Sequence, residues 1–266
     1  MGIFQAIGRG FSESRKLLNI VLIFFIFNFG MGLVMLPFSG RQSLDANGLP
    51  QFSPAAFAIS ILSVLFFIFL QGGALAMIRD LIKKGSASLG EFAANGKKYY
   101  LRILGLLAVI IVVATILVAI ASIISAGFVA SANNPFVRGV VVTVIVAIGI
   151  LSAVLLLYPI YVIVNDEAGP IAALSRGIGL STKNFWPSLG LVVVLFLITF
   201  LIAFVVSSLA IALGGVLPLT AGQVITLLVN SAAQSYLTIV MMIALMEFYL
   251  SLAGPKKQDM SSPSTI

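Results

Sequence analysis

Six long apolar runs constrain the fold of this chain more than any other feature. A transmembrane helix needs about 20 consecutive apolar residues, because it rises about 1.5 Å per residue across a hydrocarbon core about 30 Å thick. Each run meets that length. The sequence therefore predicts an all-α, polytopic membrane helix bundle with six transmembrane helices, at approximately Leu17–Phe38, Pro54–Ile78, Leu101–Ala130, Gly139–Val164, Pro187–Leu213 and Gln223–Leu252.

The composition agrees with a membrane protein and excludes several chemistries. Hydrophobic residues make up 61% of the chain and charged residues 9%, whereas soluble domains carry about 25% charged residues. The chain contains no His and no Cys, which rules out disulfides, thiolate chemistry, imidazole acid–base catalysis and the usual ligands of zinc, haem or copper. We therefore expect no cofactor, no metal site and no catalytic residue, and we predict that the protein is not an enzyme.

The basic residues are distributed unevenly between the two sides of the predicted bundle. Only Arg41 and Arg138 fall on one side, which leaves 13 of the 15 Lys and Arg residues on the other. Short cytoplasmic loops carry such an excess of Lys and Arg, so both termini are predicted to be cytoplasmic in a multi-pass protein of the cell membrane. In this setting the net charge of +7 indicates anionic lipid as a partner, not nucleic acid.

Three cytoplasmic segments carry apolar residues at helical spacing and lead directly into spans. We expect amphipathic interfacial helices at about residues 3–11, 88–98 and 167–180, lying in the headgroup plane. The second and third segments align around Lys98 and Lys183, and the first and third around Arg9 and Arg176. This pattern indicates three repeats, each an interfacial helix followed by a transmembrane hairpin. The candidate contacts for lipid headgroups are Arg9, Lys16, Lys98, Arg176 and Lys183.

Part of the sequence also resembles a known family. The motifs that carry the resemblance are Gln71-Gly72-Gly73, Tyr158-Pro159, Asn165-Asp166-Glu167 and Lys183-Asn184-Phe185-Trp186. They are similar to the membrane domain of the glycerophosphoryl diester phosphodiesterase family and of related six-span bacterial and archaeal membrane proteins. The resemblance covers approximately residues 55–250 and implies an all-helical membrane domain with no established activity. The phosphodiesterase activity does not carry over, because the chain has no His for that chemistry.

Polar residues in the sixth predicted span form the clearest candidate site. Four of them recur at every fourth position, which keeps them roughly on one side of a helix for a few turns: Thr226, Asn230, Gln234 and Thr238. In a transporter they would line a substrate path, whereas the simpler interpretation is hydrogen bonding between packed helices. Glu247 is the one acid well inside a predicted span. It lies near the cytoplasmic end, where we expect a basic residue to pair with it.

These observations support two functional hypotheses. The first is a non-enzymatic integral membrane protein, with residues 1–252 as a single membrane domain, that engages lipid or a membrane protein partner at the cytoplasmic interface. The alternative is a transporter or permease component with a polar path along the sixth span. Residues 253–266 are polar, so we expect them to form a disordered cytoplasmic tail.

Overall fold

The computed structural model describes residues 1–39, 53–129 and 135–254 of the chain. Within these ranges the protein is almost entirely helical and contains no strand. Six of its helical stretches, 25 to 36 residues long, are apolar enough to cross a membrane. The predicted all-α bundle with six transmembrane helices is therefore confirmed, and the protein is a multi-pass membrane protein. The predicted tail lies outside the described residues except for Ala253 and Gly254.

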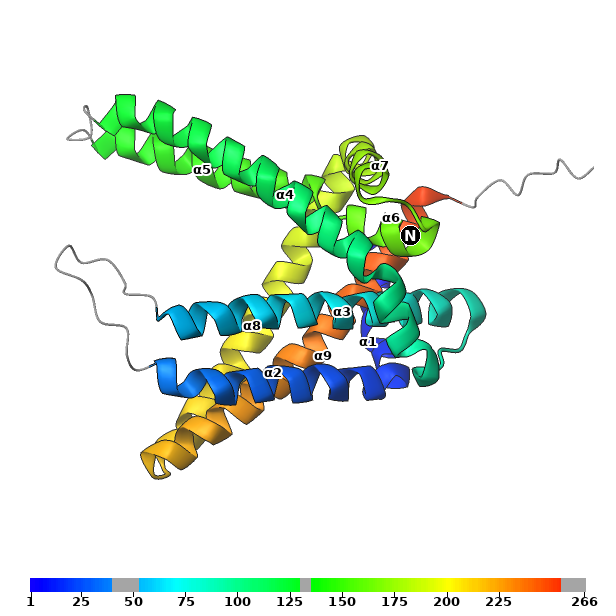
Figure 1. Cartoon of the computed structure of the whole chain (residues 1–266), viewed down its shortest axis with the longest axis vertical. Coiled ribbons are helices and arrows are strands. Elements are labelled where there is room, and N and C mark those ends of the chain that lie inside the picture. The colour runs from blue at the N-terminus through cyan, green and yellow to red at the C-terminus, as the bar shows by residue number, and fades with distance from the viewer. Residues whose placement is uncertain (40–52, 130–134, 255–266) are drawn as a thin grey trace, which may run out of the picture.

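The long helices form three hairpins, α2–α3, α4–α5 and α8–α9, and the end of the first helix and the start of the second lie on the left of Figure 1 in each hairpin. We call this the tip end. The opposite end holds α1, α6 and α7, and we call it the basic end. The elements are α1 (Ile3–Ser14), α2 (Leu18–Ser39), α3 (Pro54–Lys84), α4 (Phe92–Val129), α5 (Pro135–Leu155), α6 (Pro159–Asp166), α7 (Pro170–Lys183), α8 (Phe185–Gly215) and α9 (Leu219–Ala253), with short 3-10 helices η1 (Arg15–Leu17) and η2 (Leu89–Glu91).

Two helices carry most of the packing. α9 packs against α1, α2, α3 and α8, and α3 packs against α4 and α6 as well. The core between them contains several fully buried aromatic side chains: Phe24, Tyr99, Tyr158, Phe248 and Tyr249. These rings come from α2, α4 and α9 and from the N-cap of α6, so the core ties the hairpins together near the basic end.

Glycine lets α3 and α4 approach closely. A Cβ on Gly73 would lie 2.8 Å from the Phe92 carbonyl oxygen, and a Cβ on Gly96 would lie 2.8 Å from the Phe69 ring. The Phe69 and Phe92 rings meet edge to face, with centroids 6.4 Å apart. Each helix thus offers a glycine to the aromatic residue of the other, which holds the start of α4 against the middle of α3.

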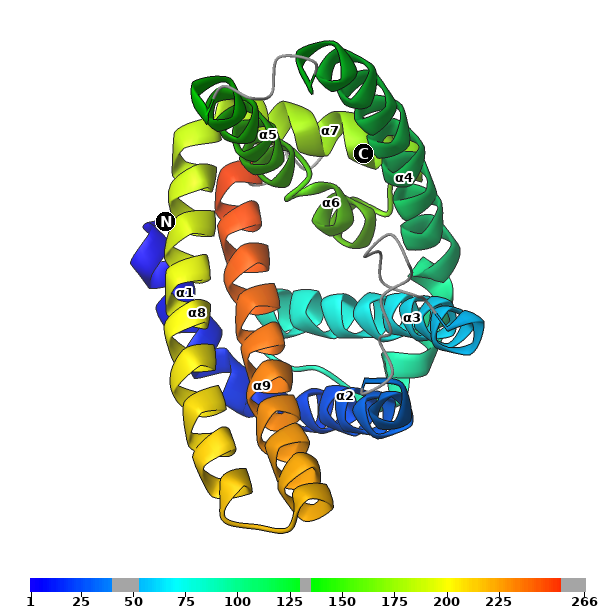
Figure 2. The same ribbon diagram turned by 90° about the vertical axis from the view of Figure 1, so that its left-hand side faces the viewer.

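The fourth predicted span is broken near the basic end. Gly139–Val164 was expected as one helix, but α5 ends at Leu155 and α6 starts again at Pro159. Proline has no N–H to donate to the preceding turn and clashes with it, so it starts a new helix instead of continuing the old one. Seen from the tip end, α6 lies in the interior of the molecule (Figure 2), against α3, α4 and α7.

The expected interfacial helices differ from the prediction in two respects. Residues 88–98 do not form a separate helix: η2 leads into α4, which continues from Phe92 without a break because no proline interrupts it. The helices near residues 3–11 and 167–180 exist as α1 and α7, but their buried faces pack on protein. On α1, a Cβ at Gly10 would lie 2.7 Å from the Val240 carbonyl oxygen of α9.

Candidate functional site

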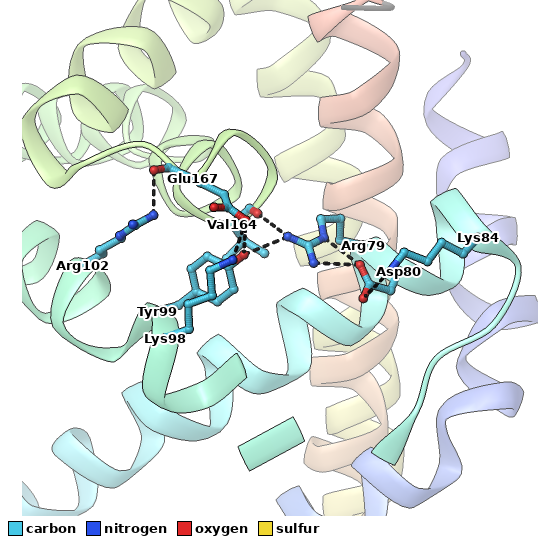
Figure 3. Close-up of polar contacts among 8 residues, drawn as sticks. All are labelled: Arg79, Asp80, Lys84, Lys98, Tyr99, Arg102, Val164 and Glu167. Atoms are coloured by element: carbon cyan, nitrogen blue, oxygen red, sulfur yellow. Dashed lines mark hydrogen bonds and ion pairs between the residues drawn. The ribbon is translucent and has the colours of Figure 1, made fainter. Parts of the chain in front are cut away.

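Arg79 joins three helices at the basic end (Figure 3). Its guanidinium donates to the carboxylate of the neighbouring Asp80 at 2.8 Å, to the Tyr99 hydroxyl of α4 at 2.8 Å, and to the Val164 carbonyl oxygen of α6 at 2.9 Å. Asp80 is only 6% exposed and also accepts from Lys84 at 3.2 Å. The fixed fork of an arginine suits such a multiple contact, because it presents several donors in one plane.

A second pair of cations holds the residue that follows α6. Lys98 donates to the Glu167 carboxylate at 2.5 Å, and Arg102 donates to the Glu167 carbonyl oxygen at 2.6 Å. The hydrogen bond from Lys98 holds the pKa of the Glu167 carboxyl below its ordinary value. Glu167 has a positive φ of 55°, the left-handed conformation that ends helices. Its contacts with α4 hold this conformation.

These contacts have a common physical cause. The last carbonyl groups of a helix have no partner within it and carry the negative end of the helix dipole. α6 is a short helix whose last turn contains the buried Val164, so the carbonyl group of Val164 must be satisfied by the protein, whereas Glu167, which follows the helix, is exposed. Arg79 supplies a positively charged donor to the Val164 carbonyl oxygen, and Arg102 supplies one to that of Glu167. The arrangement is therefore a structural clamp on the end of α6, and we call it the α6 clamp.

A separate ion pair attaches α1 to α9. Arg9 of α1 donates to the Glu247 carboxylate at 3.1 Å, and the Glu247 side chain is only 9% exposed. A second contact between the same two helices is the hydrogen bond that the Ser14 hydroxyl donates to the Tyr236 hydroxyl at 3.2 Å. The basic partner expected for Glu247 is thus Arg9, which comes from the other end of the sequence.

Four of the five cations predicted to contact lipid headgroups are paired with acids of the protein. The fifth, Lys183, is exposed, and no acidic residue in the described ranges pairs with it. Because pairing compensates a charge locally, the four paired residues offer less attraction to a headgroup than an isolated cation does. The pairs are Arg9–Glu247 at 3.1 Å, Lys16–Glu13 at 2.8 Å, Lys98–Glu167 at 2.5 Å and Arg176–Asp166 at 3.9 Å.

Two further cations share the situation of Lys183. Arg15 and Lys97 are exposed, and within the described part of the chain neither pairs with an acid. Each of the three lies near the start of a hairpin, three or four positions before an exposed apolar side chain. The chain between cation and apolar side chain is helical for Arg15 and Lys97, whereas Lys183 ends α7 and is followed by a turn at Asn184. The apolar neighbours are Leu18 (57% exposed) for Arg15, Leu101 (73%) for Lys97 and Trp186 (76%) for Lys183. We call Arg15, Lys97 and Lys183 the outward cations.

The polar stripe of α9 is used partly for helix packing. The Thr226 hydroxyl donates to the Ala210 carbonyl oxygen of α8 at 3.1 Å, and Asn230 accepts from Ser207 of α8 at 2.9 Å. Thr238 donates to the backbone of its own helix, at the carbonyl oxygen of Gln234, and the Gln234 side chain is exposed. The first half of the stripe therefore connects α9 to α8, while the second half faces elsewhere.

A cleft adjoins the first half of this stripe at the tip end. It has a volume of about 680 Å³ and lies where the ends of α2, α8 and α9 meet. Its polar lining comes from Gln223, Thr226 and Asn230 of α9. The cleft therefore places two of the four predicted stripe residues beside open space as well as against α8.

Comparison with known proteins identifies the family. A family model described as "Domain of unknown function (DUF7847)" matches residues 1–252. The chain belongs to this DUF7847 family. No curated protein and no solved structure matches it.

The chemistry available to this DUF7847 chain is that of cations, amides, hydroxyls and apolar surface. In the part of the chain that the structure describes, no group of three or more acidic, His or Cys side chains gathers in a way that would hold a metal ion. The polar groups that do come together are the α6 clamp, the Arg9–Glu247 pair and the α8–α9 contacts, all of which are partnered. The outward cations are exposed, and no acid in the described ranges pairs with them.

Proposed function

We propose that the protein is a non-enzymatic integral membrane protein that binds anionic lipid headgroups at the cytoplasmic interface through Arg15, Lys97 and Lys183. The observation that carries this proposal is the exposure of these outward cations, without an acidic partner in the described ranges, near the start of each hairpin. The exposed apolar neighbour of each cation fits the same interface, because it enters the hydrocarbon while the cation stays among headgroups.

Orientation and energy support the proposal. The excess of basic residues at the basic end favours a cytoplasmic location for that end. The cytoplasmic leaflet carries anionic lipids, and each Lys or Arg near such a surface contributes about 1 kcal/mol. Three outward cations at separate hairpins therefore attract anionic headgroups around much of the molecule.

A matched pair of triple variants tests the proposal. The test variant carries Arg15→Gln, Lys97→Gln and Lys183→Gln, and the control carries Lys16→Gln, Lys84→Gln and Arg176→Gln, so both lose the same charge. Native mass spectrometry of the purified proteins with phosphatidylglycerol and phosphatidylcholine measures the bound lipid. We expect the test variant to lose phosphatidylglycerol binding by about tenfold or more, since each cation contributes about 1 kcal/mol, and the control to lose much less. Equal retention by both variants would contradict the proposal.

The three hairpins are also proposed to be repeats of one unit. Each starts at the basic end with an outward cation before the first long helix: Arg15 before α2, Lys97 early in α4 and Lys183 before α8. α1 and α7 precede the first and third hairpins as separate helices, whereas only η2 precedes the second. This common order supports a repeat whose second copy has lost its separate leading helix.

A transporter or permease component is the second candidate. The cleft beside Gln223, Thr226 and Asn230 favours it, because it brings polar side chains of a spanning helix next to open space. A solute flux in reconstituted vesicles that the Asn230→Leu change abolishes, in a variant that still folds, would support this function. If the variant only loses stability and no flux is found, the α9 stripe serves packing.

A further inference from the structure

Two apolar grooves lie side by side along α3 and share lining residues. The first has a volume of about 510 Å³ and lies between α3 and α4, where it is lined by Leu62, Leu65, Phe66, Phe69, Lys97 and Tyr100. The second, of about 550 Å³, lies between α2 and α3 and extends toward the tip end as far as Ile59. Leu62 and Phe66 line both grooves. The two grooves therefore adjoin at Leu62 and Phe66, and we call the apolar α3 surface between Ile59 and Phe69, with the grooves on it, the trough.

The length of this trough matches one leaflet of a bilayer. Ile59 and Phe69 are ten residues apart on α3, which corresponds to about 15 Å along the helix. The hydrocarbon core is about 30 Å thick, so half of it is about 15 Å. An acyl chain of a lipid in one leaflet thus has the length to fill the trough from end to end.

The end of the trough nearer the basic end carries the polar groups. Gly96 brings α4 against Phe69 there, and the next residue, Lys97, lines the groove together with Tyr100, one turn further on. Lys97 is exposed, and no acid of the described chain pairs with it, in contrast to its neighbour Lys98, which is bound to Glu167. An unpaired cation and an amphipathic ring at one end of an apolar trough are complementary to a lipid with a negative headgroup.

We propose that this trough is a binding site for a single anionic glycerophospholipid, with one acyl chain along α3 between Ile59 and Phe69 and the phosphate group against Lys97. The site rests on the proposed function and deepens it, since it assigns one of the three outward cations to a defined lipid position. A neutral lipid fills the trough equally well with its acyl chain, so Lys97 is the group that selects the headgroup.

Quenching of a tryptophan in the trough tests this site. The only Trp is at position 186, so Trp186→Phe gives a silent background into which Phe66→Trp is introduced. The chain is reconstituted into vesicles that contain brominated phosphatidylglycerol or brominated phosphatidylcholine at equal mole fraction. A matched reporter, Phe204→Trp, places the tryptophan at an exposed position of α8 that lines neither groove. Each reporter is then combined with Lys97→Gln and, as a charge-matched control, with Lys84→Gln.

We expect the Phe66→Trp reporter to prefer phosphatidylglycerol by about fivefold, which corresponds to one cation near an anionic lipid. Lys97→Gln should abolish this preference, Lys84→Gln should preserve it, and the Phe204→Trp reporter should show none. A third result would overturn the site: the Phe204→Trp reporter is quenched, but neither brominated lipid quenches the Phe66→Trp reporter. Protein, such as a second copy of the chain, would then cover the trough in place of lipid.

Two other outcomes separate this site from the proposed function. If Phe66→Trp shows no lipid preference while the purified chain still binds phosphatidylglycerol through Arg15 and Lys183, the trough site is wrong and the proposed function stands. If the reporter shows no preference and the purified chain binds no phosphatidylglycerol, both are wrong.

Discussion

The basic end and the tip end of the bundle are built differently. At the basic end nearly every residue of α3 from Ile68 to Leu81 is buried, and α6 lies among its neighbours with its end clamped. At the tip end the α4–α5 hairpin extends away from the other two (Figure 1), and α5 is exposed at almost every described side chain from Gly139 to Leu151. The chain thus concentrates its contacts at one end.

Membrane physics explains this difference. In lipid, apolar surface gains little from burial against other apolar surface, so hairpins crossing the bilayer are free to spread. Polar backbone groups have no such freedom, because lipid offers them no hydrogen-bond partner. The buried last turn of α6, at Val164, therefore requires close packing and a charged donor beside it, and the contacts gather there.

The largest effect should come from removing the central residue of the α6 clamp. Arg79→Met leaves Asp80 buried without its main partner and frees the Val164 carbonyl oxygen, which should cost about 3 to 5 kcal/mol of stability. Thermal unfolding in detergent measures the loss. Arg15→Met, at an exposed and unpaired position, is the control and should change stability by less than about 0.5 kcal/mol. Equal unfolding temperatures for the two variants would contradict the claim that Arg79 stabilises the fold more than an exposed cation does.

The next effect concerns the contact between α6 and α7. A Cβ on Gly177 would lie 2.6 Å from both the backbone nitrogen and the ring of Pro159, whereas nothing lies within 4 Å of a Cβ on Gly179. Gly177→Ala should therefore destabilise the fold by about 1 to 3 kcal/mol through overpacking. Gly179→Ala should be neutral or stabilising, because alanine favours the helix. The same unfolding assay compares them, and a loss at Gly179 alone would contradict this packing.

A smaller effect is expected for the α8–α9 contact. Asn230→Leu removes the acceptor of the Ser207 hydroxyl, and such bonds between membrane helices contribute about 0.6 kcal/mol on average. Gln234→Leu changes an exposed side chain of the same stripe and should leave stability unchanged or raise it. Unfolding in detergent distinguishes the two, and a larger loss from Gln234→Leu would show that the second half of the stripe carries the packing.

The smallest effect concerns the exposed part of the clamp and depends on pH. The pKa of the Glu167 carboxyl is lowered, mainly by Lys98. A carboxyl whose pKa is lower in the folded state stabilises the fold at neutral pH, and this contribution disappears as the pH falls through the lowered pKa. Wild type should therefore unfold at a slightly higher temperature than Glu167→Gln at pH 7, and the difference should shrink in acid. A difference that grows in acid would have the wrong sign.

The sequence predicted the spans well because hydropathy sums over each segment and needs no knowledge of neighbours. The break at Pro159 had a local signal in the proline itself, but the apolar run around it outweighed that signal. The α6 clamp was missed, since Arg79 and Val164 are 85 residues apart and only folding brings them together. A basic partner for Glu247 was expected, but Arg9 lies 238 residues away in the sequence.

Helix phase explains the missed cations. Lys16 and Lys98 were predicted to contact lipid headgroups, but their immediate predecessors Arg15 and Lys97 are the ones that lack an acidic partner in the described chain. One position on a helix is a rotation of about 100°, which is enough to turn a side chain from an acid of the protein to the outside. For Lys98 the acid is Glu167, 69 residues away, and its position is set by the fold. For Lys16 the signal was local, since Glu13 lies three positions before it on the same helical stretch.

The most direct test of the account compares the two ends in a single measurement. Hydrogen–deuterium exchange is followed for the chain in phosphatidylcholine nanodiscs with and without phosphatidylglycerol. We predict that phosphatidylglycerol slows amide exchange in the segments around Arg15, Lys97 and Lys183 and leaves the α8–α9 connection near Val216 unchanged. Slower exchange near Val216, or no change at the basic end, would contradict the claim that anionic lipid binds there.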